Sequence, residues 1–146
     1  MEASRWFVLL LALTCSVGAL SAKPIPGPKG GRILTTAAPH AELFVEKDLR
    51  ATVTFYDAQL KPVAPADQVV NAVVEMEDGR KFKFAFDKTA AGFVSQQPLP
   101  EGDDYTIVVQ IRPAPGAGPK NYRVVYEDSP CDTCQRPQYA CICEAK

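Results

Sequence analysis

Residues 72–86 read Ala72-Val-Val-Glu-Met-Glu-Asp-Gly-Arg-Lys-Phe-Lys-Phe-Ala-Phe86, and this stretch decides the fold. Two alternating runs meet at Asp78-Gly79, a pair that favours a type I′ turn because both central residues of that turn need a positive φ. Side chains alternate along a strand, so the second run predicts one buried aromatic face and one solvated lysine face. A β-hairpin is therefore expected here. Its aromatic face, made of Phe82, Phe84 and Phe86, needs a second sheet to exclude water.

Other short runs of β-branched and aromatic residues are separated by turn residues along the rest of the chain. Pro62 and Pro65 are expected to keep the 57–67 connection out of the sheet, because proline has no N–H to donate to a ladder. The strands expected outside the hairpin are 33–36, 41–46, 49–56, 93–96, 105–111 and 122–126. This spacing predicts an all-β fold, an immunoglobulin-like β-sandwich of about seven to eight short antiparallel strands with a Cys-rich C-terminal tail.

One local pattern favours the immunoglobulin-like class. Tyr105 begins an apolar strand, with Gly102 three residues and Leu99 six residues before it. The arrangement resembles the tyrosine corner of such sandwiches, in which the phenol bonds backbone a few residues upstream. The alternative is an ordinary tyrosine at the start of a strand.

The first 22 residues have the layout of a secretory signal peptide, with Arg5 before an apolar run at 6–14 and small residues near Ala19 and Ala22. Cys15 is expected to leave with this segment, because the residues before it differ from a lipid-attachment box. No later run approaches the roughly 20 apolar residues that a membrane-spanning helix needs. We predict a signal peptide at 1–22, a mobile Pro/Gly-rich lead-in at 23–32, a sandwich at 33–128 and a tail at 129–146. Export to the periplasm or the extracellular space follows.

The charge balance argues against nucleic acid as a partner. The chain has 16 Lys and Arg against 17 Asp and Glu, a formal net charge of −1. Binding along a phosphate backbone needs a basic excess that this chain lacks.

Four thiols fall within thirteen positions at the C-terminus, in Cys131-Asp-Thr-Cys134 and Cys141-Ile-Cys143. A C-x2-C pair followed by a C-x-C pair can wrap four thiolates around one soft ion, either zinc or Cu(I). The alternative is two disulfides that cross between the pairs, because an exported protein with an even number of cysteines usually oxidises them. A redox-active Cys131/Cys134 pair is less favoured, since no βαβ unit or helix N-terminus accompanies it.

Catalysis has little support in the sequence. His40 is the only histidine and is expected to be a structural surface residue. No nucleophile-elbow or zinc-protease motif accompanies Ser95 or Ser129. Glu75 and Glu77 are expected to pair with the hairpin lysines rather than to form a catalytic carboxylate pair. We therefore expect a protein that is not an enzyme.

A family resemblance spans residues 30–111. It rests on Gly30-Gly31-Arg32, Ala41-Glu-Leu-Phe-Val45, Val53-Thr-Phe-Tyr-Asp57 and Lys61-Pro-Val63. The order resembles the small β-sandwich domain of periplasmic adaptors of heavy-metal efflux pumps of the resistance-nodulation-division type, where a His-Gly-Gly entry precedes an Asp-x-x-Gly-Lys-Pro-Val turn. Lys29 and Leu60 stand where that pattern has His and Gly, so no family ligand is assigned to Lys29, and a complete adaptor's helical hairpin and lipoyl-like parts are lacking. The resemblance implies a bacterial protein near metal homeostasis, with metal-efflux or other envelope proteins as partners.

Overall fold

The computed structural model describes residues 24–143, so the predicted signal peptide and the last three residues of the tail lie outside the described part. Nine strands and one 3-10 turn, η1 (Gln138–Ala140), make up the regular structure of that part. No helix among the described residues is long and apolar enough to cross a membrane. The strands are β1 (Arg32–Ile33), β2 (His40–Val45), β3 (Ala51–Tyr56), β4 (Pro62–Val63), β5 (Val69–Met76), β6 (Lys81–Lys88), β7 (Phe93–Ser95), β8 (Tyr105–Arg112) and β9 (Lys120–Tyr126).

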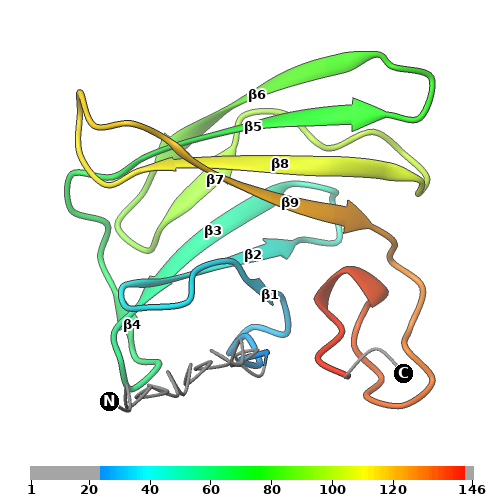
Figure 1. Ribbon diagram of the computed structural model, residues 1–146, viewed down its shortest axis with the longest axis horizontal. Coiled ribbons are helices and arrows are strands. Elements are labelled where there is room, and N and C mark those ends of the chain that lie inside the picture. The colour runs from blue at the N-terminus through cyan, green and yellow to red at the C-terminus, as the bar shows by residue number, and fades with distance from the viewer. Residues whose placement is uncertain (1–23, 144–146) are drawn as a thin grey trace, which may run out of the picture.

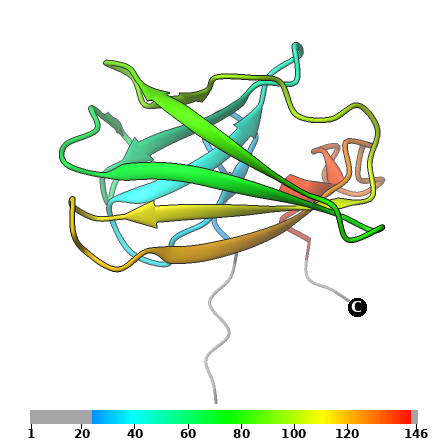
Figure 2. The same cartoon turned by 90° about the horizontal axis from the view of Figure 1, so that it is seen from above.

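The strands form two packed layers that share one strand. Antiparallel neighbours follow the order β1-β2-β3-β7-β6-β5-β8-β9, and β4 pairs with β3. The sub-orders β2-β3-β7-β6 and β5-β8-β9 are those of the two immunoglobulin sheets. Residues 81–85 of β6 pair with β5, and residues 86–88 pair with β7, so β6 passes from one layer to the other. The result is a half-barrel closed along β6 and open between β1 and β9 (Figures 1 and 2). The predicted all-β, immunoglobulin-like class is confirmed.

The central hairpin forms, but its turn differs from the predicted type. Gly79 has a φ of 85°, whereas Asp78 is not in the positive-φ region. Gly79 N–H donates to the Met76 carbonyl and Met76 N–H donates to the Arg80 carbonyl, which makes a three-residue loop with a glycine bulge. Asp78 stabilises this loop because its carboxylate accepts the Arg80 N–H. The extra loop residue shifts the register by one, so that Glu75 lies opposite Lys81.

Burial of the three hairpin phenylalanines is graded along β6. Phe84 is buried and Phe86 is half-buried, but Phe82 is 38% exposed. Phe82 lies near the hairpin tip, where the Arg80 guanidinium lies 5.7 Å from its ring centroid. The prediction of three buried rings is therefore wrong for Phe82. The two inner faces instead meet over branched and aromatic side chains that include Leu43, Val53, Phe55, Val74, Ile107 and Val109.

The 57–67 connection joins the sheet, contrary to the prediction. Pro62 lies opposite Tyr56, and Val63 lies opposite Phe55. This two-residue strand pairs on one side only, where a proline is tolerated. Asp57 accepts backbone N–H groups at the start of the turn, as predicted, and Leu60 takes a left-handed φ of 58° to close it.

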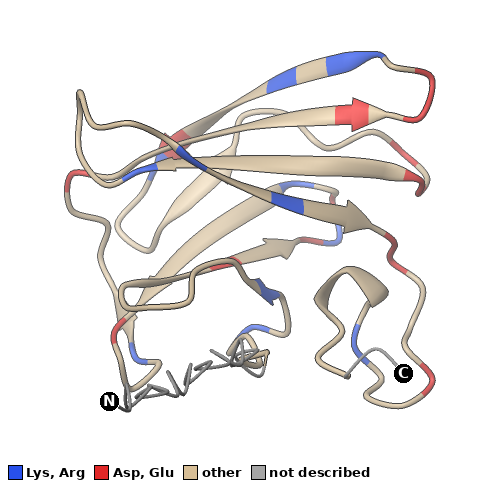
Figure 3. Ribbon diagram, viewed as in Figure 1, with Lys and Arg blue, Asp and Glu red and all other residues tan. Residues whose placement is uncertain are grey.

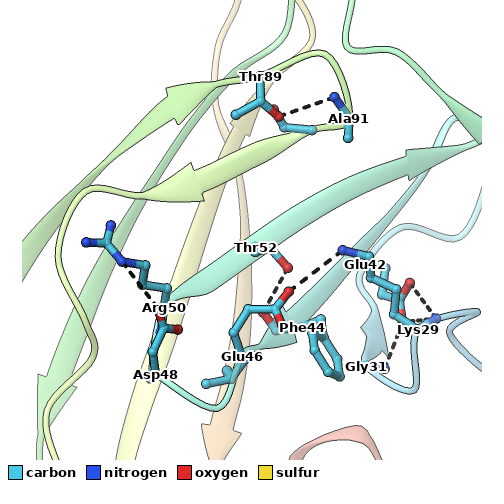
Figure 4. A network of polar contacts seen from close by, with 12 residues as sticks. Lys29, Gly31, Glu42, Phe44, Glu46, Asp48, Arg50, Thr52, Thr89 and Ala91 are labelled. Carbon is cyan, nitrogen blue, oxygen red and sulfur yellow. Dashed lines mark hydrogen bonds and ion pairs between the residues drawn. The ribbon is translucent and has the colours of Figure 1, made fainter.

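The Pro/Gly-rich lead-in is docked rather than mobile, and a buried carboxylate holds it. Glu42 is fully buried on β2, and its carboxylate accepts the N–H groups of Lys29 and Gly31 (Figure 4). The Tyr56 hydroxyl donates to the same carboxylate at 2.6 Å, and burial raises the pKa of this phenol, which keeps its proton in place. A Cβ on Gly27 would lie 2.2 Å from the carboxylate, so the close approach requires glycine there. The Glu42 carboxylate thus accepts backbone hydrogen bonds that water would otherwise accept, and in this way it holds the lead-in against the sheet.

We expect Glu42→Gln to lower the free energy of unfolding by about 2 kcal/mol, because the amide brings two donors to a site already filled with donors. Urea unfolding measures the change, and the matched control is Glu77→Gln, which alters an exposed glutamate. Amide exchange at Lys29 and Gly31 should quicken in the Glu42 variant alone. Equal stability of the two variants would show that Glu42 does not hold the lead-in.

The tyrosine corner is present. Tyr105 is buried at the start of β8, and its hydroxyl donates to the Pro100 carbonyl at 3.2 Å. Its ring stacks on Tyr126 of β9, with centroids 4.9 Å apart. The corner therefore ties the 99–104 loop to the β8-β9 layer.

Tyr105→Phe should cost about 1 to 3 kcal/mol of stability, because the Pro100 carbonyl loses its donor in a largely buried site. Thermal and urea unfolding test this against Tyr122→Phe, which removes the hydroxyl of a half-buried tyrosine. A loss of stability no larger than that of Tyr122→Phe would mean that water can take the place of the Tyr105 hydroxyl at the Pro100 carbonyl.

Candidate metal centre

Two short turns in the tail bring the cysteines together. In the first, Cys131 N–H donates to the Arg136 carbonyl at 2.7 Å and Gln135 N–H donates to the Cys131 carbonyl at 2.9 Å. Gln135 has a left-handed φ of 58°, which reverses the chain directly after Cys134. In the second, η1 leads into Cys141, whose N–H donates to the Gln138 carbonyl. The first turn thus carries Cys131 and Cys134, and the second leads into Cys141 and Cys143, where the Cys143 N–H donates to the Cys141 Sγ at 3.4 Å.

All four sulfurs lie within 4.8 Å of one another. The Sγ atoms of Cys131 and Cys141 are 3.4 Å apart, while Cys131 to Cys143 and Cys134 to Cys141 are each 3.8 Å. A disulfide joins sulfurs about 2.05 Å apart, so none of these pairs is bonded. Four sulfurs at about 2.3 Å from a central zinc ion form a tetrahedron with edges of about 3.8 Å. Two of the separations equal such an edge, the Cys131–Cys141 separation is shorter at 3.4 Å, and all six lie within 4.8 Å, so the residues fit a tetrahedral metal ion.

Backbone N–H groups stabilise the thiolate form of the first pair. The N–H groups of Cys134 and Thr133 lower the pKa of the Cys131 thiol. Those of Arg136 and Ile142 lower the pKa of Cys134 to about 6. Hydrogen bonds to a charged form favour that form, so the fold prepares Cys134 to be a ligand at neutral pH.

The second pair retains its protons when no cation is present. Neighbouring sulfurs, those of Cys141 and Cys134 first, raise the pKa of Cys143 to about 12. Thiolates packed this closely repel one another, so the charge on one sulfur disfavours charge on the next. A dication at the centre removes this repulsion and deprotonates all of its thiol ligands.

The residues beside the cysteines anchor the centre to the sandwich. Cys131 is buried, whereas the other three cysteines are half-buried. Between the pairs, Tyr139 is buried and Ala140 is fully buried. Arg32 donates to the Cys141 carbonyl at 3.2 Å, which places a cation at the edge of the thiol cluster. The centre is thus part of the folded domain.

The other candidate residues do not assemble into a site. His40 is buried at 7% exposure rather than on the surface, and its Nδ1 has no partner within the described residues. Buried Ser95 accepts the Ala51 N–H and donates to the Gln97 carbonyl, so it is structural. Exposed Ser129 bonds the Glu127 carboxylate. None of these hydroxyls is bonded to the imidazole.

The predicted charge pairing on the hairpin is confirmed in part. Glu75 pairs with Lys81 at 2.7 Å and also with Arg123 of β9 at 2.5 Å, and these cations lower its pKa. Figure 3 shows acidic positions on β5 and basic positions on β6 and β9. Lys83 lies opposite Val73, so the shifted register leaves it without the expected acidic partner. This surface is an ordinary solvated sheet face.

Comparison with protein-family models, curated proteins and solved structures finds no match. The resemblance to efflux adaptor domains therefore stays a prediction. The functional argument rests on the geometry of the tail.

The pKa values predict the order in which the reduced, metal-free thiols are alkylated. At pH 7 Cys134 is mainly thiolate, and its rate with iodoacetamide should halve as the pH falls to about 6. Cys143 keeps its proton at neutral pH and should react slowest. Peptide mapping of singly modified protein after short exposures measures both rates. Equal labelling of these two cysteines at pH 7 would contradict the assigned hydrogen bonds.

Proposed function

We propose that this protein is an exported, non-catalytic metal-handling accessory protein that holds one zinc or Cu(I) ion through Cys131, Cys134, Cys141 and Cys143. The observation that carries the proposal is the convergence of four unbonded sulfurs within 4.8 Å. Soft thiolate ligands select these two metals over harder cations. The signal-like leader supports export, and the adaptor resemblance suggests envelope or metal-efflux proteins as partners.

Charge and geometry favour zinc within this pair of metals. Four thiolates around Zn²⁺ leave a net charge of −2, whereas Cu(I) leaves −3. The cations bonded to this region are Arg32, which donates to the Cys141 carbonyl, and Arg136, which donates to the Gly27 carbonyl. The two positive charges of these arginines balance the −2 charge of the zinc complex more fully than the −3 charge of the Cu(I) complex. Closed sites with four cysteines are also the common form of structural zinc.

The second candidate is a structural or protein-interaction sandwich whose tail is closed by two disulfides. It draws support from the predicted export and from the closest contact, Cys131 to Cys141, which crosses between the two pairs. Forming the bond would require those sulfurs to approach by more than 1 Å from their 3.4 Å separation. The unbonded arrangement fits the metal better.

Protein purified from the exported fraction should contain one zinc or copper ion per chain, with four thiols that become titratable only after chelation. Intact mass, elemental analysis and thiol titration measure this together. Each of the four Cys→Ser variants should lose most of the metal, while Ser129→Ala, in the same tail, should keep it. A mass about four hydrogens light, with no metal and no free thiol, would establish the disulfide form instead.

A further inference from the structure

The half-barrel has one open side, and the tail lies at one end of it. The first strand, β1, reaches only Leu43 and Glu42 of β2, so within residues 24–143 no strand flanks β2 on that side at Phe44 and Val45. The last strand, β9, ends the order on the other layer. Figures 1 and 2 place the tail beyond the end of β9, and Arg136 and Cys141 of the tail contact Gly27 of the lead-in and Arg32 of β1.

Tyr139 bridges the two layers across this opening. Its ring lies 5.4 Å from that of Tyr126, which continues the stack begun by Tyr105 in the β8-β9 layer. Its hydroxyl accepts the N–H of Val45, at the end of β2, at 3.1 Å. The side chain is only 4% exposed. One tyrosine thus packs on one layer and supplies a hydrogen-bond acceptor to the other.

Backbone and arginine contacts hold the tail on both sides. Tyr139 N–H donates to the Glu127 carbonyl and Gln138 N–H donates to the Ser129 carbonyl, which binds the tail to the chain leaving β9. Arg32 of β1 bonds the Cys141 carbonyl, and Arg136 bonds the Gly27 carbonyl of the lead-in. On the tail side, all of these contacts are made by residues within or directly beside the loop that joins the two cysteine pairs.

The contacts are too few to keep this loop docked on the sandwich, although the turns that carry the cysteines have hydrogen bonds of their own. Apart from η1, residues 127–143 contain no regular element and bury one large side chain, Tyr139. Fixing the loop on the sandwich costs conformational entropy, which a single large buried ring and the five hydrogen bonds that join the loop to its surroundings do not offset. A metal ion that joins Cys131 and Cys134 to Cys141 and Cys143 offsets that cost, because the free energy of coordination then contributes to folding of the tail.

We propose that metal binding closes the open side of the half-barrel: the loaded centre seats Tyr139 between Tyr126 and Val45, and metal loss releases it. This inference rests on the proposed metal function and adds its consequence, which is a metal-dependent surface formed by the tail, the end of β2 and the lead-in. The metal controls the structure of this surface. The sandwich core from β5 to β8 folds without it.

The test compares amide hydrogen exchange in the zinc-loaded protein and in the chelated protein, with a reductant present so that no disulfide forms. Chelation should speed exchange at Val45 and Tyr139 by at least tenfold, a change typical of local opening. Exchange at Val74 and Val109, in β5 and β8, should not change. Zinc stoichiometry is measured on the same samples.

Tyr139→Phe separates docking from folding. It keeps the ring that packs on Tyr126 but removes the acceptor, so the Val45 amide should lose protection even with one zinc bound. Tyr122→Phe is the matched control and should leave that amide protected. One zinc per chain with equal protection at Val45 and Tyr139 in both states would overturn this inference alone. Failure to bind zinc or copper at all would overturn the metal function and, with it, this inference.

Discussion

A single strand that donates and accepts ladder hydrogen bonds in both layers sets the architecture. Because β6 pairs with β5 over its first half and with β7 over its second, the two sheets are joined on that side and cannot separate. On the opposite side, between β1 and β9, the described residues contain no shared strand. The short strand β1, the lead-in and the tail with its cysteines all lie on that opposite side. The core needs no more than the alternation of β-strands, whereas the open side depends on particular polar and sulfur groups.

Polar groups on the open side work because they meet complementary partners out of water. Glu42 would be costly to bury alone, yet it faces two backbone N–H groups and a phenol, so each of its oxygens is satisfied. The sulfurs follow the same principle. Backbone N–H groups lower the pKa of Cys131 and Cys134, while crowding by other sulfurs raises that of Cys143. A cation held between the sulfurs would remove this repulsion without protons on the second pair, which links the electrostatics of the tail to its chemistry.

The sequence predicted what depends on local alternation and failed where distant groups decide. Most strand positions, the tyrosine corner and the grouping of the four cysteines could be predicted, because period-two patterns and short spacings are local, whereas the two-residue strand β4 was missed. Burial of Phe82 was wrongly predicted, since the extent of the covering layer is a tertiary property. The role of Glu42 has no local signal either, because its donors come from a segment that reads as a spacer. Tyr139 is a similar case: its partner Val45 lies 94 residues away, and only the packed fold reveals the contact.

The bond from Val45 to Tyr139 has a consequence for behaviour in a crowded compartment. A strand border with unsatisfied N–H groups can recruit a strand from another molecule and so seed aggregation. Here a phenol from the same chain occupies that position, and a side-chain oxygen offers no further ladder for a newcomer to extend. On the other layer, the charged side chains of Lys120 and Arg123 on the edge strand β9 disfavour pairing with a strand of another molecule. Both edge strands are thus protected from pairing with another molecule: β9 by its charged side chains and β2 by the Tyr139 side chain.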